Sequence, residues 1–139
     1  MLRQSNTILP IRAGRQGLHE ITPEVDRFVA SSEIREGLLT LFCRHTSASL
    51  LIHENAAPAA QRDTEAFFAR LAPEGADYEH DDEGPDDMPA HLRTALTATQ
   101  LSIPVMNGRL ALGTWQGIFL FEHRRGPHVR EIALHLVGE

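Results

Sequence analysis

The sequence contains no lysine, because all thirteen of its basic residues are arginine. Schiff-base catalysis and a Walker-A phosphate loop both depend on a lysine side chain, so both are excluded. An anionic substrate must then be held by arginine, by backbone N–H groups or by a metal ion. The net charge of −6 also argues against a general nucleic-acid-binding protein, which normally presents a basic surface.

Cysteine and long apolar runs are scarce as well. Cys43 is the only cysteine, which excludes an internal disulfide and a cysteine-based zinc finger and is typical of a reducing compartment. No apolar run approaches the roughly 20 residues that span a bilayer, and the N-terminus lacks the pattern of a signal peptide. We therefore expect a cytoplasmic protein with no membrane partner, folded as one domain over residues 1–139.

Hydrophobic periodicity predicts a β-rich α+β fold, an antiparallel or mixed β-sandwich with about three short helices. Gly14 and Gly17 are expected to form a turn, Asn107-Gly108 a hairpin turn, and Thr22 and Asn55 to be the N-terminal caps of the first two helices. The helices are expected at about 23–32, 57–71 and 88–98. The strands are expected at about 2–12, 38–45, 50–52, 101–105, 109–112, 117–123 and 129–137, with Pro10 favouring a sheet edge for the first.

The segment 109–124 has the most distinctive pattern. Two apolar runs enclose Gly-Thr-Trp-Gln-Gly at 113–117, which holds the only tryptophan. Glycine on each side allows a tight turn or bulge that presents Trp115 and Gln116 to a ligand. Alternatively, Trp115 fills the core. The segment runs into a titratable cluster, Glu-His-Arg-Arg at 122–125.

Three histidines, His45, His91 and His123, each lie at the end of an expected element. Three imidazoles with one open position would suit zinc or a similar divalent metal, although none shows local H-x-x-x-H spacing. The acidic segment 74–87 could instead bind Mg²⁺ with a diphosphate through Asp81, Asp82, Asp86 and Asp87, or form a solvated face. Arg124, Arg125 and Arg130 could grip a phosphate, the alternative being scattered surface arginine.

Nucleophilic catalysis receives less support. Cys43 and His45 share a strand face, but apolar neighbours raise the pKa of a thiol and make it inert. Ser47 and Ser49 follow His45 closely, yet the chain has no G-x-S-x-G elbow and adjacency in sequence is not triad geometry.

Taken together, these motifs resemble the YjbQ-type family, usually labelled secondary thiamine-phosphate synthase. The resemblance covers nearly the whole chain and implies a β-rich sandwich that assembles as a homotrimer. Most members carry asparagine where this chain has His53, and His123 and Arg124 match only the members with an EHR sequence. The motifs are HTSASL (45–50), HEN (53–55), Asp63, YEHDDEGPDDMPAHL (78–92), IPVMNGRLALGTWQGIFLFEHR (103–124) and the closing Gly138-Glu139.

The resemblance implies an activity that joins hydroxymethylpyrimidine diphosphate to thiazole phosphate, giving thiamine phosphate and pyrophosphate. Trp115 would stack on the pyrimidine, Gln116 or Asp63 would hydrogen-bond its amino group, and Arg124 and Arg130 would hold the phosphates. His45 and His91 would coordinate a metal or protonate the leaving group. The implied polar positions are His45, Thr46, Ser47, Asn55, Asp63, His91, Trp115 and Gln116.

Two other classes of function remain open at this point. One is a metal-dependent hydrolase or phosphatase that uses His45, His91 and His123. The other is a non-catalytic trimer that binds a small metabolite. All three readings expect a small phosphorylated or polar ligand and no organic cofactor, with Mg²⁺ or Zn²⁺ as the metal where one is used.

Overall fold

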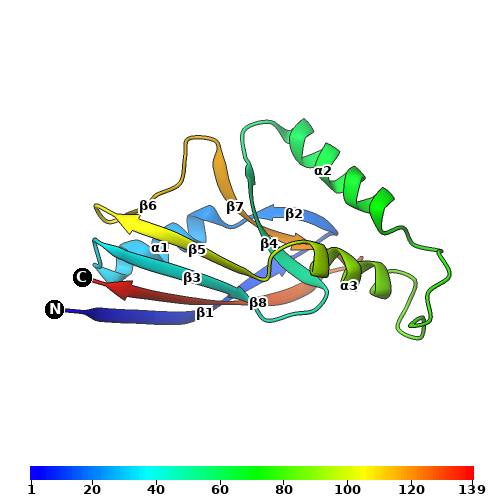
Figure 1. The fold of residues 1–139 in the computed structure, drawn as a ribbon, viewed down its shortest axis with the longest axis horizontal. Helices are drawn as coiled ribbons and strands as arrows, with labels where there is room; N and C mark the ends of the chain where they lie inside the picture. Colours follow the sequence, from blue (N-terminus) through cyan, green and yellow to red (C-terminus); the bar gives the residue numbers. More distant parts are fainter.

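Two antiparallel sheets face each other in the computed structural model, which describes residues 1–139 (Figure 1). The five-stranded sheet has the order β1 (Arg3–Ala13), β8 (His128–Gly138), β3 (Gly37–Cys43), β5 (Gln100–Met106) and β6 (Arg109–Leu110). The three-stranded sheet has the order β2 (Gly17–Glu20), β7 (Gln116–Glu122) and β4 (Ala48–Glu54). The helices are α1 (Thr22–Ser32), α2 (Pro58–Leu71) and α3 (Asp87–Leu96). The predicted β-rich α+β sandwich is confirmed, with β1 at a sheet edge.

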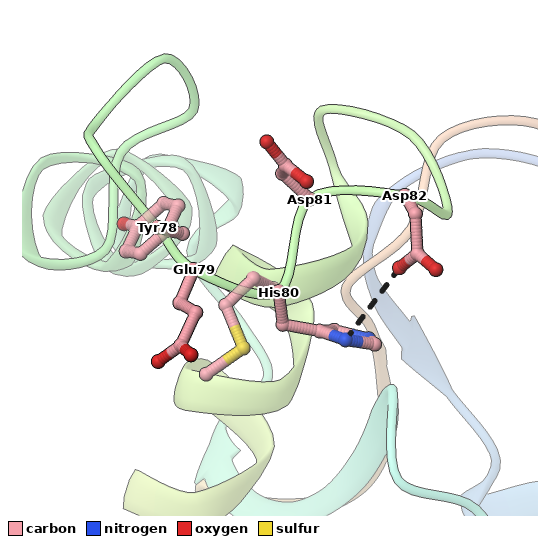
Figure 2. Close-up of a pocket in the computed structure, with 6 residues that line it drawn as sticks. Tyr78, Glu79, His80, Asp81 and Asp82 are labelled. Atoms are coloured by element: carbon pink, nitrogen blue, oxygen red, sulfur yellow. Dashed lines mark ion pairs between the residues drawn. The ribbon is translucent and has the colours of Figure 1, made fainter.

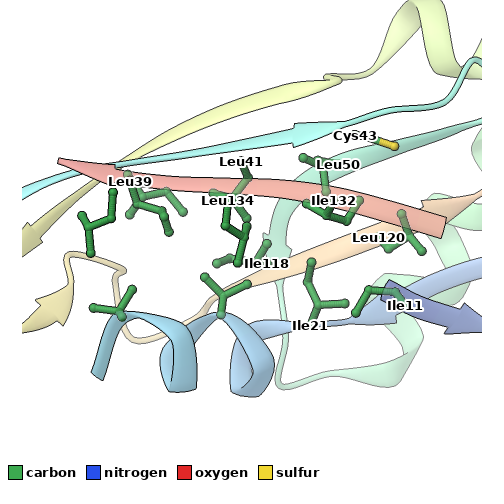
Figure 3. Packing of buried hydrophobic residues seen from close by; sticks show 14 of the residues in the cluster. Ile11, Ile21, Leu39, Leu41, Cys43, Leu50, Ile118, Leu120, Ile132 and Leu134 are labelled. Carbon is green, nitrogen blue, oxygen red and sulfur yellow. The ribbon is translucent and has the colours of Figure 1, made fainter. Parts of the chain in front are cut away.

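The main core lies between the sheets and α1. Alternation along β3 turns Leu39, Leu41 and Cys43 inward, and the opposite residues of β8 do the same. Figure 3 shows these side chains meeting Ile118 and Leu120 of β7. This core holds 18 buried residues, so a small chain acquires a stable frame without a disulfide.

A second, smaller core explains why β7 reads as a continuous apolar run. Phe119 and Phe121 point away from the main core and cluster with Leu18. Phe68 of α2 packs edge-on against Phe121, with ring centroids 5.4 Å apart. The strand is therefore covered on both faces, by the facing sheet on one and by α2 on the other (Figure 1). No helix of the structure is both long and apolar enough to cross a membrane.

Both expected helix caps, Thr22 and Asn55, were wrong, whereas the turn glycine Gly17 has an additional role. Gly17 has a φ of +121° as expected of a turn glycine, yet it also begins β2, a four-residue strand that pairs with β7. Asn55 does not cap α2, because its amide donates to Glu20. The carboxylate of Glu54 instead accepts the N–H groups of residues 56 and 57 ahead of the helix. Thr22 lies inside α1, where its hydroxyl donates to Glu20.

Candidate functional site

Four side chains that can bind a metal gather where the acidic loop meets α3. They are His80, Glu83, Asp87 and His91, and their ligand atoms all lie within 4.8 Å of one another. Asp87 and His91 are four residues apart in α3, so they share a helix face. Oδ2 of Asp87 lies 3.1 Å from Nε2 of His80 and 3.0 Å from Nε2 of His91. One carboxylate oxygen thus joins both imidazoles.

The ring of His91 is oriented by the β3–β4 connection. Its Nδ1 lies 2.8 Å from the carbonyl oxygen of Thr46. A carbonyl only accepts, so Nδ1 carries the hydrogen and the neutral ring keeps its lone pair on Nε2, the atom that faces Asp87. A backbone carbonyl on one ring nitrogen is the usual way in which a protein fixes a metal-binding histidine.

Arg124 holds the carboxylates of α3 in place. Its Nη2 and Nε donate to the two oxygens of Asp86 at 3.1 and 3.3 Å, and its Nη1 lies 3.4 Å from Oδ1 of Asp87. Burial opposes ionisation, but these bonds and the N–H of Arg125 keep the pKa of Asp86 below its usual value. Arg124 is therefore engaged by protein carboxylates, and it leaves Oδ2 of Asp87 for the imidazoles.

His80 is supplied by the loop, beside Asp82 (Figure 2). Desolvation works against its charged form, but hydrogen bonds with Asp87 and Glu83 outweigh it and raise the pKa of His80. The acidic surroundings therefore favour positive charge at this point. A metal ion bound by the two imidazoles and two carboxylates would also place positive charge there. This set of donor atoms fits zinc or a similar divalent ion.

His91 also lines a shallow hollow of about 580 Å³. Nε2 of His45 accepts the N–H of Glu131 at 2.8 Å, so the neutral ring carries its hydrogen on Nδ1. Burial, aided by Arg130, lowers the pKa of His45 and keeps the ring neutral. The structure therefore brings the predicted residues His45 and His91 to one surface. The hollow is lined by His45, Thr46, His91, Thr94, Ala95, Thr97 and Thr99.

His123 lies elsewhere. It is fully buried, with Nε2 2.9 Å from the hydroxyl of Ser49. Burial, together with the charges of Arg93 and Arg130, lowers the pKa of His123 to about 3. Of the three histidines predicted as ligands, only His91 belongs to the group of four, and His45 and His123 lie outside it.

The buried ring of His123 should make the fold acid-sensitive. Its folded-state pKa, about 3, lies below the ordinary 6.5, so the unfolded chain binds more protons between these values. The full contribution of His123 to the free energy of unfolding is therefore present above pH 6.5. It is lost as the pH drops towards 3, by about 2 kcal/mol between pH 7 and pH 5. Urea unfolding at the two pH values measures this. A His123→Gln variant should lose that share of the pH dependence, and an unchanged dependence would contradict the assignment.

Arg130, Ser47 and Cys43 are committed to the interior. Nε of Arg130 donates to Oε1 of Glu122 at 2.7 Å, and its Nη2 reaches the carbonyl of Ser47 at 3.3 Å. Both charged side chains are buried, so Arg130 is not free to grip a phosphate from solvent. The Cys43 thiol lies 3.3 Å from the carbonyl of Ala48, and burial raises the pKa of Cys43 to about 11. Cys43 is thus inert as a nucleophile.

The remaining predicted residues lie away from this end. Trp115 and Gln116 are exposed at the start of β7, whereas Glu122, next to the site, ends it. Six residues of strand separate the two ends by about 20 Å. Asn55 contacts the same far end, where its N–H donates to the carbonyl of Trp115. Asp63 is exposed on α2 and has no side-chain partner. Trp115 does not fill the core.

Sequence reasoning missed His80 and Glu83. Both lie in the acidic segment, which was considered only for its aspartates. Two short spacings carried the signal: His-x-x-Glu at 80–83 and Asp-x-x-x-His at 87–91, the second at one helical turn. Neither is the H-x-x-x-H pattern, and a loop residue such as His80 can be placed only by the fold.

Comparisons with known proteins agree with this picture of the fold. The family model described as "UPF0047 protein YjbQ-like" matches residues 7–139. A UPF0047 protein of Synechocystis is 52% identical over 138 residues, covering 99% of this chain and 94% of that protein. YjbQ of Escherichia coli O157:H7 is 43% identical over 132 residues, covering 94% and 96%. A YbjQ-like protein of unknown function from Sulfolobus solfataricus superposes with a TM-score of 0.92 at 25% identity, and the two chains cover each other fully.

Proposed function

The chain belongs to the YjbQ-like UPF0047 family, and from that premise we propose that it is a metal-dependent enzyme acting on a diphosphate ester of a small metabolite. The observation that carries the proposal is the group of four ligand residues, His80, Glu83, Asp87 and His91, beside the hollow that His91 also lines. The reaction we propose is the one that the family resemblance implies, thiamine phosphate formation from hydroxymethylpyrimidine diphosphate and thiazole phosphate.

The residues present fit a divalent metal. Two imidazoles and two carboxylates make a mixed donor set, and the imidazoles favour zinc or a similar ion over Mg²⁺, which prefers oxygen. Arg124 and the carbonyl of Thr46 fix the orientation of Asp87 and His91. When bound, the metal would neutralise diphosphate charge and polarise the oxygen that leaves.

The hollow would hold the organic part of the substrate. Its wall carries four threonines, which offer both methyl groups and hydroxyls. Thr94 is one of them, and its hydroxyl is buried and has no partner in the protein. His45 carries its hydrogen on Nδ1 and can donate it to an oxygen of the substrate. The methylene–oxygen bond would break, pyrophosphate would leave with the electron pair, and the thiazole nitrogen would form the new bond to carbon.

Within one chain, Trp115 and Gln116 lie too far from His91 to contact the same small ligand. Stacking of Trp115 on a pyrimidine in the hollow would need a second copy of the chain. We therefore assign recognition of the organic group to the hollow residues His45, Thr46 and Thr94.

A second candidate function, phosphate-ester hydrolysis, is favoured by one observation. His80 and Glu83 are exposed, so water can reach the group directly. Imidazole and carboxylate ligands with an open, water-accessible position are typical of catalytic zinc sites in hydrolases. The two functions share phosphate binding but break different bonds. The alkylation breaks the methylene carbon–oxygen bond and joins the carbon to the thiazole nitrogen, whereas the hydrolase adds water to phosphorus and breaks a phosphorus–oxygen bond.

Pyrophosphate release separates these functions. We expect the zinc-loaded protein to release pyrophosphate from hydroxymethylpyrimidine diphosphate only when thiazole phosphate is present, with thiamine phosphate formed in equal amount. Release of phosphate or pyrophosphate that is independent of thiazole phosphate would support the hydrolase instead. Saturable binding without release of either product, measured by calorimetry, would leave metabolite binding as the function.

We also propose that the chain associates with copies of itself, as a trimer, through the outer face of the five-stranded sheet. Strand register places apolar residues in rows across this face: Ile8, Ala133 and Phe42 in one, Val137, Leu38 and Pro104 in another. Ile8, Leu38 and Phe42 are each more than two-fifths exposed, and all three helices lie elsewhere. An exposed apolar sheet face of this extent is typical of a protein interface.

Phe42→Glu should therefore dissociate the assembly, because the charge would lie in the middle of the buried row. Sedimentation velocity at micromolar concentration should show trimer for the parent chain and monomer for the variant. Phe67→Glu is the matched control, since Phe67 is exposed to a similar degree on α2. A trimer that survives Phe42→Glu and dissociates with Phe67→Glu would place the interface on α2.

A further inference from the structure

A second polar cavity, of about 310 Å³, lies between β7, α2 and α3, and it is independent of the group at His80. Arg93 and His123 form part of its wall, together with Phe68, Phe121, Glu65 and Arg15. We propose that this cavity binds a small oxyanion, a carboxylate or phosphate group held by Arg93 and His123. The proposal uses none of the four metal-binding residues, so it stands or falls separately from the function proposed above.

Arg93 is a buried cation without a counter-ion. The residue is only 6% exposed, and its guanidinium makes a single hydrogen bond, from Nη2 to the carbonyl of Ala72 at 2.8 Å. Its Nε is buried with no partner. Glu74 and Asp86 act on it only from a distance, and each is paired with another arginine. A buried charge is normally paired, so this guanidinium lacks an anion.

His123, which lines the same cavity, carries a second unpartnered nitrogen. The residue is 0% exposed, and Nδ1 has no hydrogen-bond partner. The hydroxyl of Thr97 lies 2.6 Å from that of Ser49, closer than the 2.8 Å to the carbonyl of Arg93, which already accepts a backbone N–H. We therefore assign the Thr97 proton to Ser49, so that Ser49 donates to Nε2 and the imidazole hydrogen lies on Nδ1. Two residues that line one cavity then each carry a buried N–H group without a partner.

The carboxylates that line the cavity do not neutralise Arg93. Glu65 pairs with Arg15 at 3.2 Å and accepts the N–H of Leu18. Glu122 is paired with Arg130. The uncompensated charge is therefore one guanidinium, which matches one carboxylate or one phosphate group. The volume is at the lower end of that of ligand pockets, which restricts the occupant to a small acid.

The resonance of the Arg93 Nε–H group tests the proposal directly in the unmodified full-length protein. ¹H–¹⁵N spectra are recorded while sodium phosphate and sodium acetate are titrated separately, with sodium chloride keeping the ionic strength constant. We expect a saturable shift of this resonance with at least one of the two anions and none with chloride. The anion that binds more tightly shows whether the cavity prefers a tetrahedral phosphate or a planar carboxylate.

Variants supply the second measurement. Arg93→Gln should weaken binding of the preferred anion roughly tenfold or more, since a hydrogen bond to a charged group contributes about 1.5–3 kcal/mol. Arg93→Lys, which keeps the charge and lacks Nε, should weaken it less. Arg70→Gln, an exposed arginine of α2, should leave binding unchanged. If neither anion shifts the Nε–H resonance saturably, or if Arg93→Gln binds as the parent does, the cavity is not an anion site.

Discussion

Replacement of Asp87 by asparagine is expected to lower zinc affinity at least about a hundredfold. Loss of an outer-shell partner alone costs about 10–100-fold in metal affinity, and Asp87 would bind the metal directly. Oδ2 of Asp87 joins His80 and His91, and its side chain is almost fully buried. An amide has one fewer acceptor oxygen and no charge, so it can neither bind the metal as well nor pair with Arg124. Zinc content by mass spectrometry and affinity by competition with a chelator measure the loss.

Asp81→Asn is the matched control, because Asp81 lies exposed in the same loop and makes no ion pair. Pyrophosphate release should fall with Asp87→Asn in parallel with zinc content and remain unchanged with Asp81→Asn. His91→Ala should also lose the metal, whereas His45→Ala should retain it, because His45 is not among the four gathered ligands. A zinc content that stays near one per chain in Asp87→Asn would show that the carboxylate of Asp87 is not a zinc ligand.

The sequence predicted the elements well where periodicity is local. The apolar run of 117–121 and the alternation of 129–137 each indicated a strand, and the structure places both in sheets. β2 escaped detection because it has only four residues, too short for a period-two pattern, and exists because β7 provides its partner. Thr22 and Asn55 have side chains that suit a helix cap, but both donate to Glu20, which lies two residues before Thr22 and 35 residues before Asn55.

The candidate site was only partly predictable. His91 and Arg124 were found from their places at element ends, and the structure brings them to the group at α3. His80 was hidden, because an acidic loop is usually a solvated face and its path cannot be deduced from composition. Proximity in sequence misled for Trp115 and His123, since an extended strand carries the two residues to opposite ends of β7.

Arg130 presents the sharpest difference between sequence and structure. From the sequence it is a phosphate-binding arginine, whereas in the structure it forms a buried ion pair with Glu122. Glu122 also accepts the backbone N–H of Arg124 at 3.0 Å, so the pair ties the end of β7 to β8 beneath the candidate site. The two assignments predict different consequences when the pair is broken.

Glu122→Gln should lower the free energy of unfolding by about 3–5 kcal/mol, because it leaves the Arg130 guanidinium charged and unpaired in the interior. The exposed pair of Arg44 and Glu131 provides the control, and Glu131→Gln should cost at most about 1 kcal/mol. Replacing both partners, as Glu122→Leu with Arg130→Met, should restore much of the loss, since no buried charge remains. Urea unfolding of the four proteins measures these differences. A stable double variant that binds substrate normally would assign Arg130 to the fold, whereas a stable double variant that no longer binds substrate would return Arg130 to phosphate recognition.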